Sequence, residues 1–245
     1  MTAREVADGF SSVDAQVDDT RAALPDVKGE RRFTRPGSGT GWILLAVMTA
    51  IAIGIGVLAW QALPHNPGEG SAEAGFLRDM QTHHSQAVEM AMTIRDRTSD
   101  EQLRSMATDI AFSQATESGM MTGYLDAWGL PFAGSDAPMT WMGHPLMSGE
   151  LMPGMATTEQ VAQLKTLPVA QAEILFLQVM IRHHQGGVEM ANDILARSDN
   201  RLVGDMANRI VRVQSSEIDT MNQFLVSRGQ QPITDPLPES HSHGT

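Results

Sequence analysis

The pattern of apolar and polar positions divides the chain into regions of different chemistry. Residues 1–40 mix acids, bases, Gly, Ser and Pro with almost no periodic apolar positions, and such a segment buries too little surface to fold. Residues 41–63 carry no charge and are apolar on every side, which predicts a helix long enough to cross a bilayer. After a Pro/Gly-rich linker at 64–70, helical periodicity continues through a domain at 71–229. The final residues, 230–245, are expected to form a flexible tail, as are the first 40.

Apolar residues recur at helical spacing in four long segments, which predict helices at about 71–97, 99–128, 168–197 and 199–229. Ser99 and Asp199 are the expected N-caps of the second and fourth helices. Because the members of each pair are joined by short turns, they should pack antiparallel. Residues 130–167 form a long crossover with a short helix starting near Thr157. The sequence therefore predicts an all-α fold, a ferritin-like four-helix bundle with one long crossover, preceded by a transmembrane helix.

The two helix pairs repeat each other, at 71–129 and 168–229. FLRDMQTHHSQAVEMA at 76–91 and FLQVMIRHHQGGVEMA at 176–191 share Phe, Leu, Met, two His, Val, Glu, Met and Ala at an offset of 100 residues. The register continues into the second helix of each pair, where Gln and Glu also return. A repeat that restores the same polar residues predicts a pseudo-symmetric polar site inside the bundle.

Helical geometry turns these polar side chains towards the interior. A rotation of about 100° per residue places His83 and His84 on either side of the buried stripe through Met80. Gln114 and Glu117 follow the apolar spacing of the next helix, and the second repeat has the same arrangement. Buried imidazole and carboxylate groups need a partner or a ligand, and both can bind a metal ion. The candidate metal ligands are Met80, His83, His84, Glu117, Met180, His183, His184 and Glu217, with Gln114 and Gln214 as groups that orient them.

Two alternatives accompany this interpretation. The same residues can form a hydrogen-bonded network that specifies the bundle and binds nothing. Glu89 and Glu189 also repeat, but they fall opposite Met80 and Met180 on the helical wheel, so we expect them to make surface ion pairs.

The crossover contains a second candidate metal site. Thioether sulfur is a soft ligand suited to Cu(I), and a Gly/Pro-rich segment can wrap several sulfurs around one ion. Methionine also fills gaps in protein cores, so packing is the alternative. The candidate residues are Met139, Met142, His144, Met147, Met152 and Met155. His241 and His243 near the end form a weaker candidate.

Composition and charge restrict the function further. The chain has no cysteine, so neither a disulfide nor a thiolate metal ligand is available. A formal net charge of −12 argues against nucleic acid as a partner. Arg31, Arg32 and Arg35 precede the apolar segment, and Trp42 and Trp60 lie near its ends. This pattern predicts a single-pass protein of the bacterial cell membrane with a cytoplasmic N terminus and an extracytoplasmic bundle; a cleaved signal peptide is the alternative.

The duplicated helix resembles the hallmark of the bacterial domain-of-unknown-function family 305, Met-x-x-His-His-x-x-x-Val/Ile/Ala-x-Met-Ala, over about residues 71–229. The segment 152–155, Met-Pro-Gly-Met, is similar to a short Met-containing stretch that commonly precedes the second copy. The resemblance implies a ferritin-like fold. Since some members bind copper in the bacterial envelope, it also implies a copper-binding domain in which both His pairs match the family signature.

Three functions follow from these patterns. The leading hypothesis is a membrane-anchored, non-catalytic copper-binding protein that buffers the ion or passes it on. A di-iron or di-manganese oxidase is the second, but such enzymes usually have Glu three residues before His. Here that residue is Met80 before His83 and Met180 before His183, which favours copper over iron. The third is a metal-free structural or interaction subunit of an envelope complex whose partner is unknown.

Overall fold

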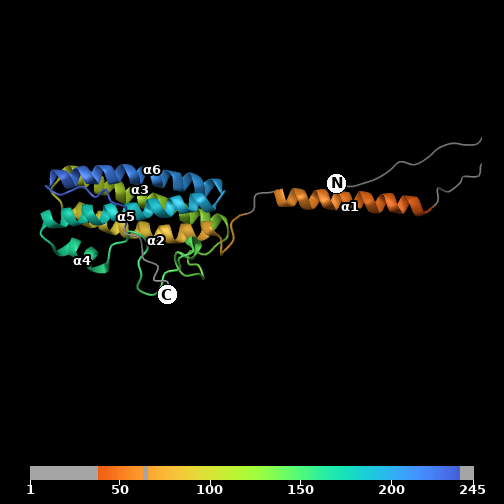
Figure 1. Ribbon diagram of the computed structural model, residues 1–245, viewed down its shortest axis with the longest axis horizontal. Helices are drawn as coiled ribbons and strands as arrows, with labels where there is room; N and C mark the ends of the chain where they lie inside the picture. Colours follow the sequence, from red (N-terminus) through yellow and green to blue (C-terminus); the bar gives the residue numbers. More distant parts are fainter. Residues whose placement is uncertain (1–37, 63–65, 238–245) are drawn as a thin grey trace, which may run out of the picture. The chain divides into compact units, whose positions relative to one another are not determined.

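The computed structural model describes residues 38–62 and 66–237, which contain six α-helices, one short 3-10 helix and no strand. The helices are α1 (Ser38–Ala62), α2 (Ala72–Arg97), α3 (Glu101–Ala127), η1 (Thr140–Met142), α4 (Thr158–Thr166), α5 (Val169–Arg197) and α6 (Arg201–Ser227) (Figure 1). The predicted all-α architecture is confirmed. The chain divides into two compact units, at 1–63 and 64–245.

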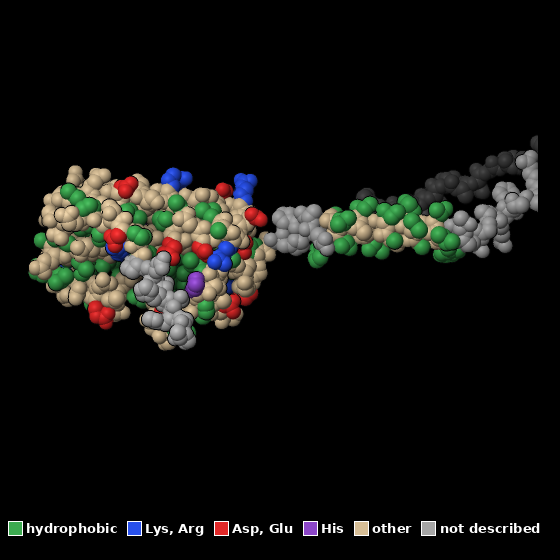
Figure 2. Space-filling view, viewed as in Figure 1, with side chains coloured by type: hydrophobic (Ala, Val, Ile, Leu, Met, Phe, Trp, Pro, Cys, Tyr) green, Lys and Arg blue, Asp and Glu red, His purple; other side chains and the backbone are tan. Residues whose placement is uncertain are grey.

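Helix α1 belongs to the first unit. Its segment Gly41–Trp60 has a mean hydropathy of 2.5 and is long and apolar enough to cross a membrane. Apolar side chains lie along the face of this helix that Figure 2 shows. Residues 1–37, which make up nearly all of the expected N-terminal tail, lie outside the described residues.

The second unit is a bundle of two helical hairpins. Helix α2 packs on α3, α5 packs on α6, and the hairpins meet where α2 contacts α5 (Figure 1). The hydroxyl of Thr98, at the end of α2, donates to Glu173 of α5 at 2.6 Å, and that of Ser198, at the end of α5, donates to Glu73 of α2 at 2.5 Å. These bonds are 100 residues apart in the sequence. They show that α2 and α5 are antiparallel and related by a pseudo-twofold axis.

The helix starts are set by side-chain caps. Asp100 accepts from the backbone N–H groups of residues 102 and 103, and Asn200 does the same for 202 and 203. The N-caps expected at Ser99 and Asp199 were therefore wrong by one residue. Thr157 forms the capping box that starts α4, in agreement with the sequence.

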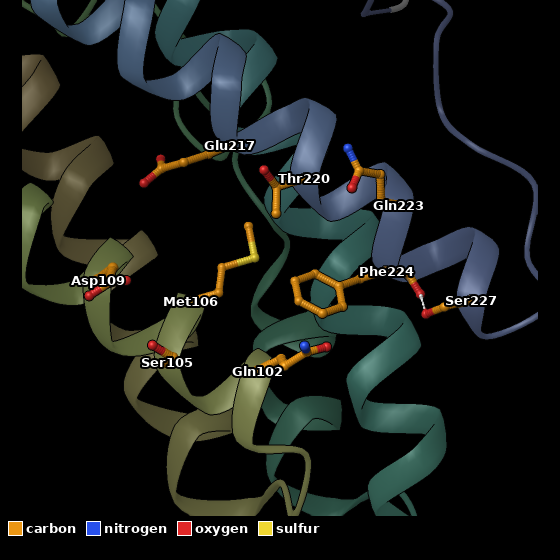
Figure 3. A pocket seen from close by; sticks show the side chains of 9 residues that line it. All are labelled: Gln102, Ser105, Met106, Asp109, Glu217, Thr220, Gln223, Phe224 and Ser227. Carbon is orange, nitrogen blue, oxygen red and sulfur yellow. Dashed lines mark hydrogen bonds between the residues drawn. The ribbon is translucent and has the colours of Figure 1, made fainter.

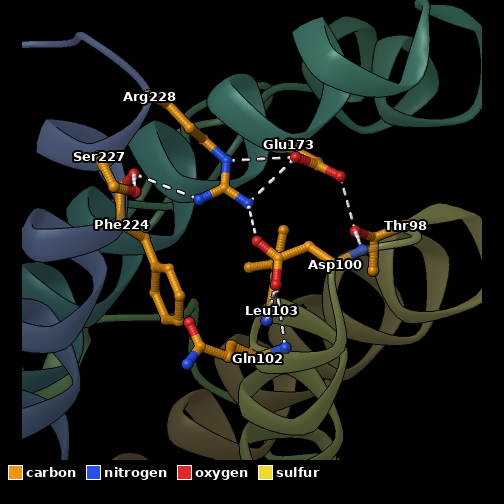
Figure 4. Close-up of polar contacts among 8 residues, drawn as sticks. All are labelled: Thr98, Asp100, Gln102, Leu103, Glu173, Phe224, Ser227 and Arg228. Carbon is orange, nitrogen blue, oxygen red and sulfur yellow. Dashed lines mark hydrogen bonds and ion pairs between the residues drawn. The ribbon is translucent and has the colours of Figure 1, made fainter.

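At one end of the bundle lies an ionic network around Arg228, the C-cap residue that follows α6 (Figure 4). Its guanidinium donates to Asp100 at 2.6 Å and to Glu173 at 3.1 Å, and Glu173 also accepts from Thr98. The network connects the last residues of α6 to the α2–α3 turn and to α5. The first repeat has Trp128 at the position of Arg228, so the pseudo-symmetry does not extend to this end.

The residues after α6 follow the bundle surface. The Asn222 side chain exchanges two hydrogen bonds with the backbone of Ile233, and the Arg182 guanidinium pairs with Asp235 at 2.7 Å. Ile233 and Asp235, within the segment expected to be a flexible tail, are thus bonded to the bundle. His241 and His243 lie outside the described residues.

Candidate metal centre

The four histidines of the duplicated motif lie in the bundle interior, on the two helices that join the hairpins. All four side chains are 0% exposed. The rings of His83 and His183 have centroids 3.7 Å apart with an interplanar angle of 35°. The rings of His183 and His184 are farther apart, at 6.3 Å. The structure thus brings one histidine of each pair into direct contact, where α2 crosses α5.

Each of these histidines uses its Nε2 atom in a hydrogen bond. His83 donates to the carbonyl of Pro153 at 3.0 Å, and His183 donates to the carbonyl of His83 at 3.0 Å. Because a carbonyl only accepts, both rings carry their proton on Nε2. His84 and His184 bind Glu117 and Glu217 through Nε2; these distances are 2.9 and 2.7 Å.

The Nδ1 atoms of the four rings have no partner among the described residues. In the rings of His83 and His183, Nδ1 carries the lone pair that can bind a metal ion. Metal-binding histidines typically donate their other ring N–H to a carbonyl or carboxylate, as these do. The amide atoms of Gln114 and Gln214 are also buried without partners. Within the described part of the chain, however, no three His, Asp or Glu side chains are close enough together to hold one metal ion.

The electrostatic environment keeps the central pair neutral. Burial lowers the pKa of His83 to about 3, with a further contribution from His84. Burial also lowers the pKa of His183 well below its ordinary value, and His83 adds to the effect. At neutral pH both rings are therefore uncharged, and no proton competes for their lone pairs.

The two carboxylates of the motif have different surroundings. The Arg209 guanidinium donates to Glu117 and to the Met120 sulfur, each at 3.2 Å. In the other half, Asp109 occupies the position equivalent to Arg209, and Glu217 lines a groove of about 650 Å³. Side chains of α3 and α6 face each other across this groove (Figure 3). The pseudo-symmetry of the histidines thus does not extend to the charges around them.

The methionines one turn before the histidines are core residues. Met80 and Met180 are 0% exposed and belong to hydrophobic clusters. The Met80 cluster also contains Met139, Met142 and Met152 of the crossover. Met80 therefore shares a cluster with crossover methionines and with Met190 of α5, whereas Met180 belongs to the other cluster.

The Met-rich crossover encloses a cavity of about 480 Å³. Five of the six predicted crossover residues line it, namely Met139, Met142, His144, Met152 and Met155. Met147 is 72% exposed and is absent from the cavity wall. A histidine reaches the surface here (Figure 2), and His144 is the exposed one among the described histidines. The cavity is thus lined by thioether sulfurs and by an imidazole that is exposed to solvent.

Glu189 is exposed, as its position on the helical wheel predicted, and it also lines this cavity, which the sequence pattern did not indicate. It lines the cavity together with His144, and among the described residues it forms no ion pair. Burial raises the pKa of its carboxyl, Asp193 raises it further, and His144 opposes both effects. Its repeat partner Glu89 does pair with Lys165, at 2.7 Å, as expected. Glu189 thus lies on an outer face of α5 that is open to solvent beside the crossover.

Asp79 is a second residue that the sequence analysis missed. Its carboxylate accepts the backbone N–H of Met139 at 2.7 Å and the indole N–H of Trp141 at 2.8 Å. Met139 has a φ of 65°, a left-handed conformation that is costly for a residue with a side chain. Asp79 holds this turn at the cavity wall. The second repeat has Val179 at the same position. This difference between the repeats was the signal in the sequence that could have identified Asp79.

Comparison with known proteins agrees with this architecture. Residues 73–225 match the model of the family described as "Domain of unknown function (DUF305)". A DUF305 protein from Streptomyces coelicolor is 46% identical with a TM-score of 0.64, covering 69% of this chain and 100% of its own. A DUF305 fragment from Deinococcus radiodurans is 37% identical with a TM-score of 0.56, covering 66% and 99%.

A third solved structure, of CopM in the Cu(II)-bound form, is 25% identical with a TM-score of 0.52 and covers 63% of this chain and 96% of its own. Among curated protein sequences, no relative matches this chain. The family match extends over both helical hairpins and the crossover between them, and so includes both histidine pairs. The chain therefore belongs to the DUF305 family.

Proposed function

We propose that this protein binds copper outside the cytoplasm, anchored to the membrane by α1, and buffers the ion or passes it to another protein. The observation that carries this proposal is the cavity in the crossover, which is lined by four methionines and one histidine. The mechanism is ligand exchange, without a catalytic step.

The donor set of the cavity fits a soft ion. Thioether sulfur prefers Cu(I), whereas Mg²⁺, Ca²⁺ and Mn²⁺ prefer the oxygen donors that are scarce here. Met139, Met142, Met152 and Met155 supply the sulfurs, and His144 supplies a nitrogen. Because His144 is exposed, an incoming ion or an acceptor protein can reach the site from solvent. That access is needed for handover.

The likeness to CopM supports copper as the metal, since that protein was solved with Cu(II) bound. The membrane anchor is supported by the apolar length of Gly41–Trp60. The extracytoplasmic location of the bundle is supported by three arginines in the sequence before this segment, which favour a cytoplasmic N terminus.

The interior histidines provide a second candidate site. The four unpartnered Nδ1 atoms favour it, with Glu117 and Glu217 holding two of the rings. In this variant of the proposal the Nδ1 atoms of His83 and His183 would hold the ion. Full burial leaves no direct route for exchange, so the crossover cavity is the better place for copper that is handed on.

The proposal is tested with the full-length protein in detergent, titrated with Cu(I) against a chromophoric chelator. We expect the cavity variant, in which all four cavity methionines are replaced by Leu, to lose Cu(I) binding. Met147→Leu is the matched control because this methionine is exposed and outside the cavity. Its affinity should equal that of the wild type.

The combined variant His83→Ala/His183→Ala separates the two sites. Loss of copper in this variant, with retention in the cavity variant, would move the site to the bundle interior. Stoichiometric Fe(II) binding with oxygen consumption would instead support an oxidase. If no metal binds to the wild type, the protein is a metal-free interaction subunit and the proposal fails.

A further inference from the structure

The segment Met152–Met155 carries two of the cavity methionines, and its backbone is held against α2 and α5. We propose that His83 is a positioning residue for this segment: by donating its Nε2–H to the Pro153 carbonyl, it fixes the geometry in which Met152 and Met155 present their sulfurs to copper. This inference rests on the proposed function and assigns a role to a signature histidine that does not require it to touch the metal.

The contact between His83 and Pro153 is directional, and its histidine is fully buried. The Nε2···O distance is 3.0 Å, and the histidine side chain is 0% exposed. The carbonyl of His83 in turn accepts the Nε2–H of His183, also at 3.0 Å. A continuous path of two hydrogen bonds thus leads from α5 through α2 to the loop. A hydrophobic side chain in place of His83 would leave the Pro153 carbonyl without this donor.

A second contact holds the other end of the segment. The Gln86 side chain donates to the Ala156 carbonyl at 2.9 Å and accepts the Ala156 N–H at 2.8 Å. Gln86 lies three residues after His83, so both side chains project from neighbouring turns of α2. Together they bind the backbone on both sides of Met155.

Helix α5 makes room for the same segment. A Cβ atom added to Gly186 would lie 1.9 Å from the Pro153 carbonyl oxygen, and one added to Gly154 would lie 2.1 Å from the Arg182 carbonyl oxygen. The loop backbone therefore lies directly on the α5 backbone. Gly186 is the repeat equivalent of Gln86. In the first repeat the Gln86 side chain forms hydrogen bonds with the loop. In the second repeat the absence of a side chain at Gly186 leaves space for the loop backbone.

These contacts place the two sulfur-bearing residues before any ion arrives. Met152 is 5% exposed and belongs to the hydrophobic cluster that contains Met80, while Met155 packs at its margin. A ligand pair that is already ordered loses less conformational entropy on binding, which raises affinity without adding a contact. Residues that orient metal ligands typically change metal affinity by roughly 10- to 100-fold when they are mutated.

The test changes the loop position without removing any metal donor. Gly186→Ala introduces a methyl group that the Pro153 carbonyl cannot accommodate, and Gly119→Ala on α3, where an added Cβ meets nothing within 4 Å, is the matched control. His83→Phe removes the Nε2–H donor and keeps an aromatic ring, while His83→Gln retains an N–H. Cu(I) affinity is measured on the full-length protein in detergent by chelator competition, and X-ray absorption counts the sulfur and nitrogen donors.

We expect Gly186→Ala and His83→Phe to lower Cu(I) affinity by roughly 10- to 100-fold. We expect His83→Gln to recover part of the loss and Gly119→Ala to match the wild type. The number of nitrogen donors at copper should be the same in the wild type and in His83→Gln. Circular dichroism and thermal unfolding identify variants that have lost the fold. If His83→Phe is one of them, the Cu(I) affinity of Gly186→Ala tests the inference.

Wild-type affinity in both Gly186→Ala and folded His83→Phe would overturn the inference. So would the loss of one nitrogen donor in the His83 variants together with unchanged binding in Gly186→Ala, because His83 would then be a ligand. Failure of the proposed function would give a different result. Either the variant in which Leu replaces the four cavity methionines would still bind copper, or the wild type would bind none.

Discussion

At the scale of single residues, the site depends on buried polar groups whose partners lie far away in the sequence. His83 bonds to Pro153, and Asp79 bonds to Met139 and Trp141. Helical periodicity predicted that the histidines face inward because this follows from position along one helix. It could not predict which atom each ring would contact, since the partner belongs to the crossover.

Asp79 leads to a prediction about pH. Burial raises the pKa of its carboxyl above the ordinary value of 3.8, although the hydrogen bonds from Met139 and Trp141 act in the opposite direction. The folded state then holds this proton more tightly than the unfolded state does. Its contribution to stability is therefore full below the ordinary pKa and is lost as pH rises through the folded pKa.

Asp79→Asn should remove this dependence, because an amide does not ionise while its oxygen can still accept. We expect the free energy of unfolding of the variant, relative to wild type, to increase as pH rises above about 4. Urea titrations between acid and neutral pH measure the difference. A difference that stays constant over this range would contradict the prediction.

At the scale of helices, local signals located the elements well and their ends less well. Apolar spacing found α2, α3, α5 and α6 because each helix buries one stripe. The caps were misplaced by one residue, since Ser99 and Asp199 are as suitable chemically as the true caps Asp100 and Asn200. Only the backbone conformation at the turn distinguishes them.

The capping assignment gives the second prediction. Asn200→Ala should lower the free energy of unfolding by about 1 kcal/mol, because the N–H groups of residues 202 and 203 lose their acceptor. Asp199→Ala is the matched control and should have almost no effect. Chemical denaturation of both variants measures this; a larger loss in Asp199→Ala would show that the sequence-based assignment of the cap was correct.

At the scale of the whole molecule, the chain combines a helix with the length and composition of a membrane span and a bundle of the DUF305 family. The two compact units are consecutive in the sequence, and the boundary between them lies between residues 63 and 64. The family match falls entirely within the second unit. The first unit is the part that we propose as an anchor.

This division gives the third prediction. The full-length chain should remain in the membrane fraction after alkaline carbonate washing, because about 20 apolar residues suffice to span the bilayer. A chain that begins at residue 64 should be soluble and unfold at the same temperature as the bundle in the full-length protein. Recovery of a mature protein that lacks residues 1–63 from cells would favour a cleaved signal peptide and contradict the anchor.

The sequence by itself determined the all-α class, the two repeated hairpins and the burial of His83, His84, His183 and His184. These features follow from periodicity and internal repetition, which act within one helix or between copies of the same pattern. Each amphipathic helix must cover its apolar stripe, so position in the sequence suffices to decide which side chains face inward.

Only the tertiary structure decided how the crossover lies on the bundle. It put Glu189 into a cavity and Met147 into solvent, and brought Pro153 onto Gly186. A Gly/Pro-rich segment has no periodicity of its own, and its path is set by contacts with helices far along the chain. The same long-range contacts made the two repeats differ, because the crossover covers parts of α2 and α5 that are not equivalent in the repeat.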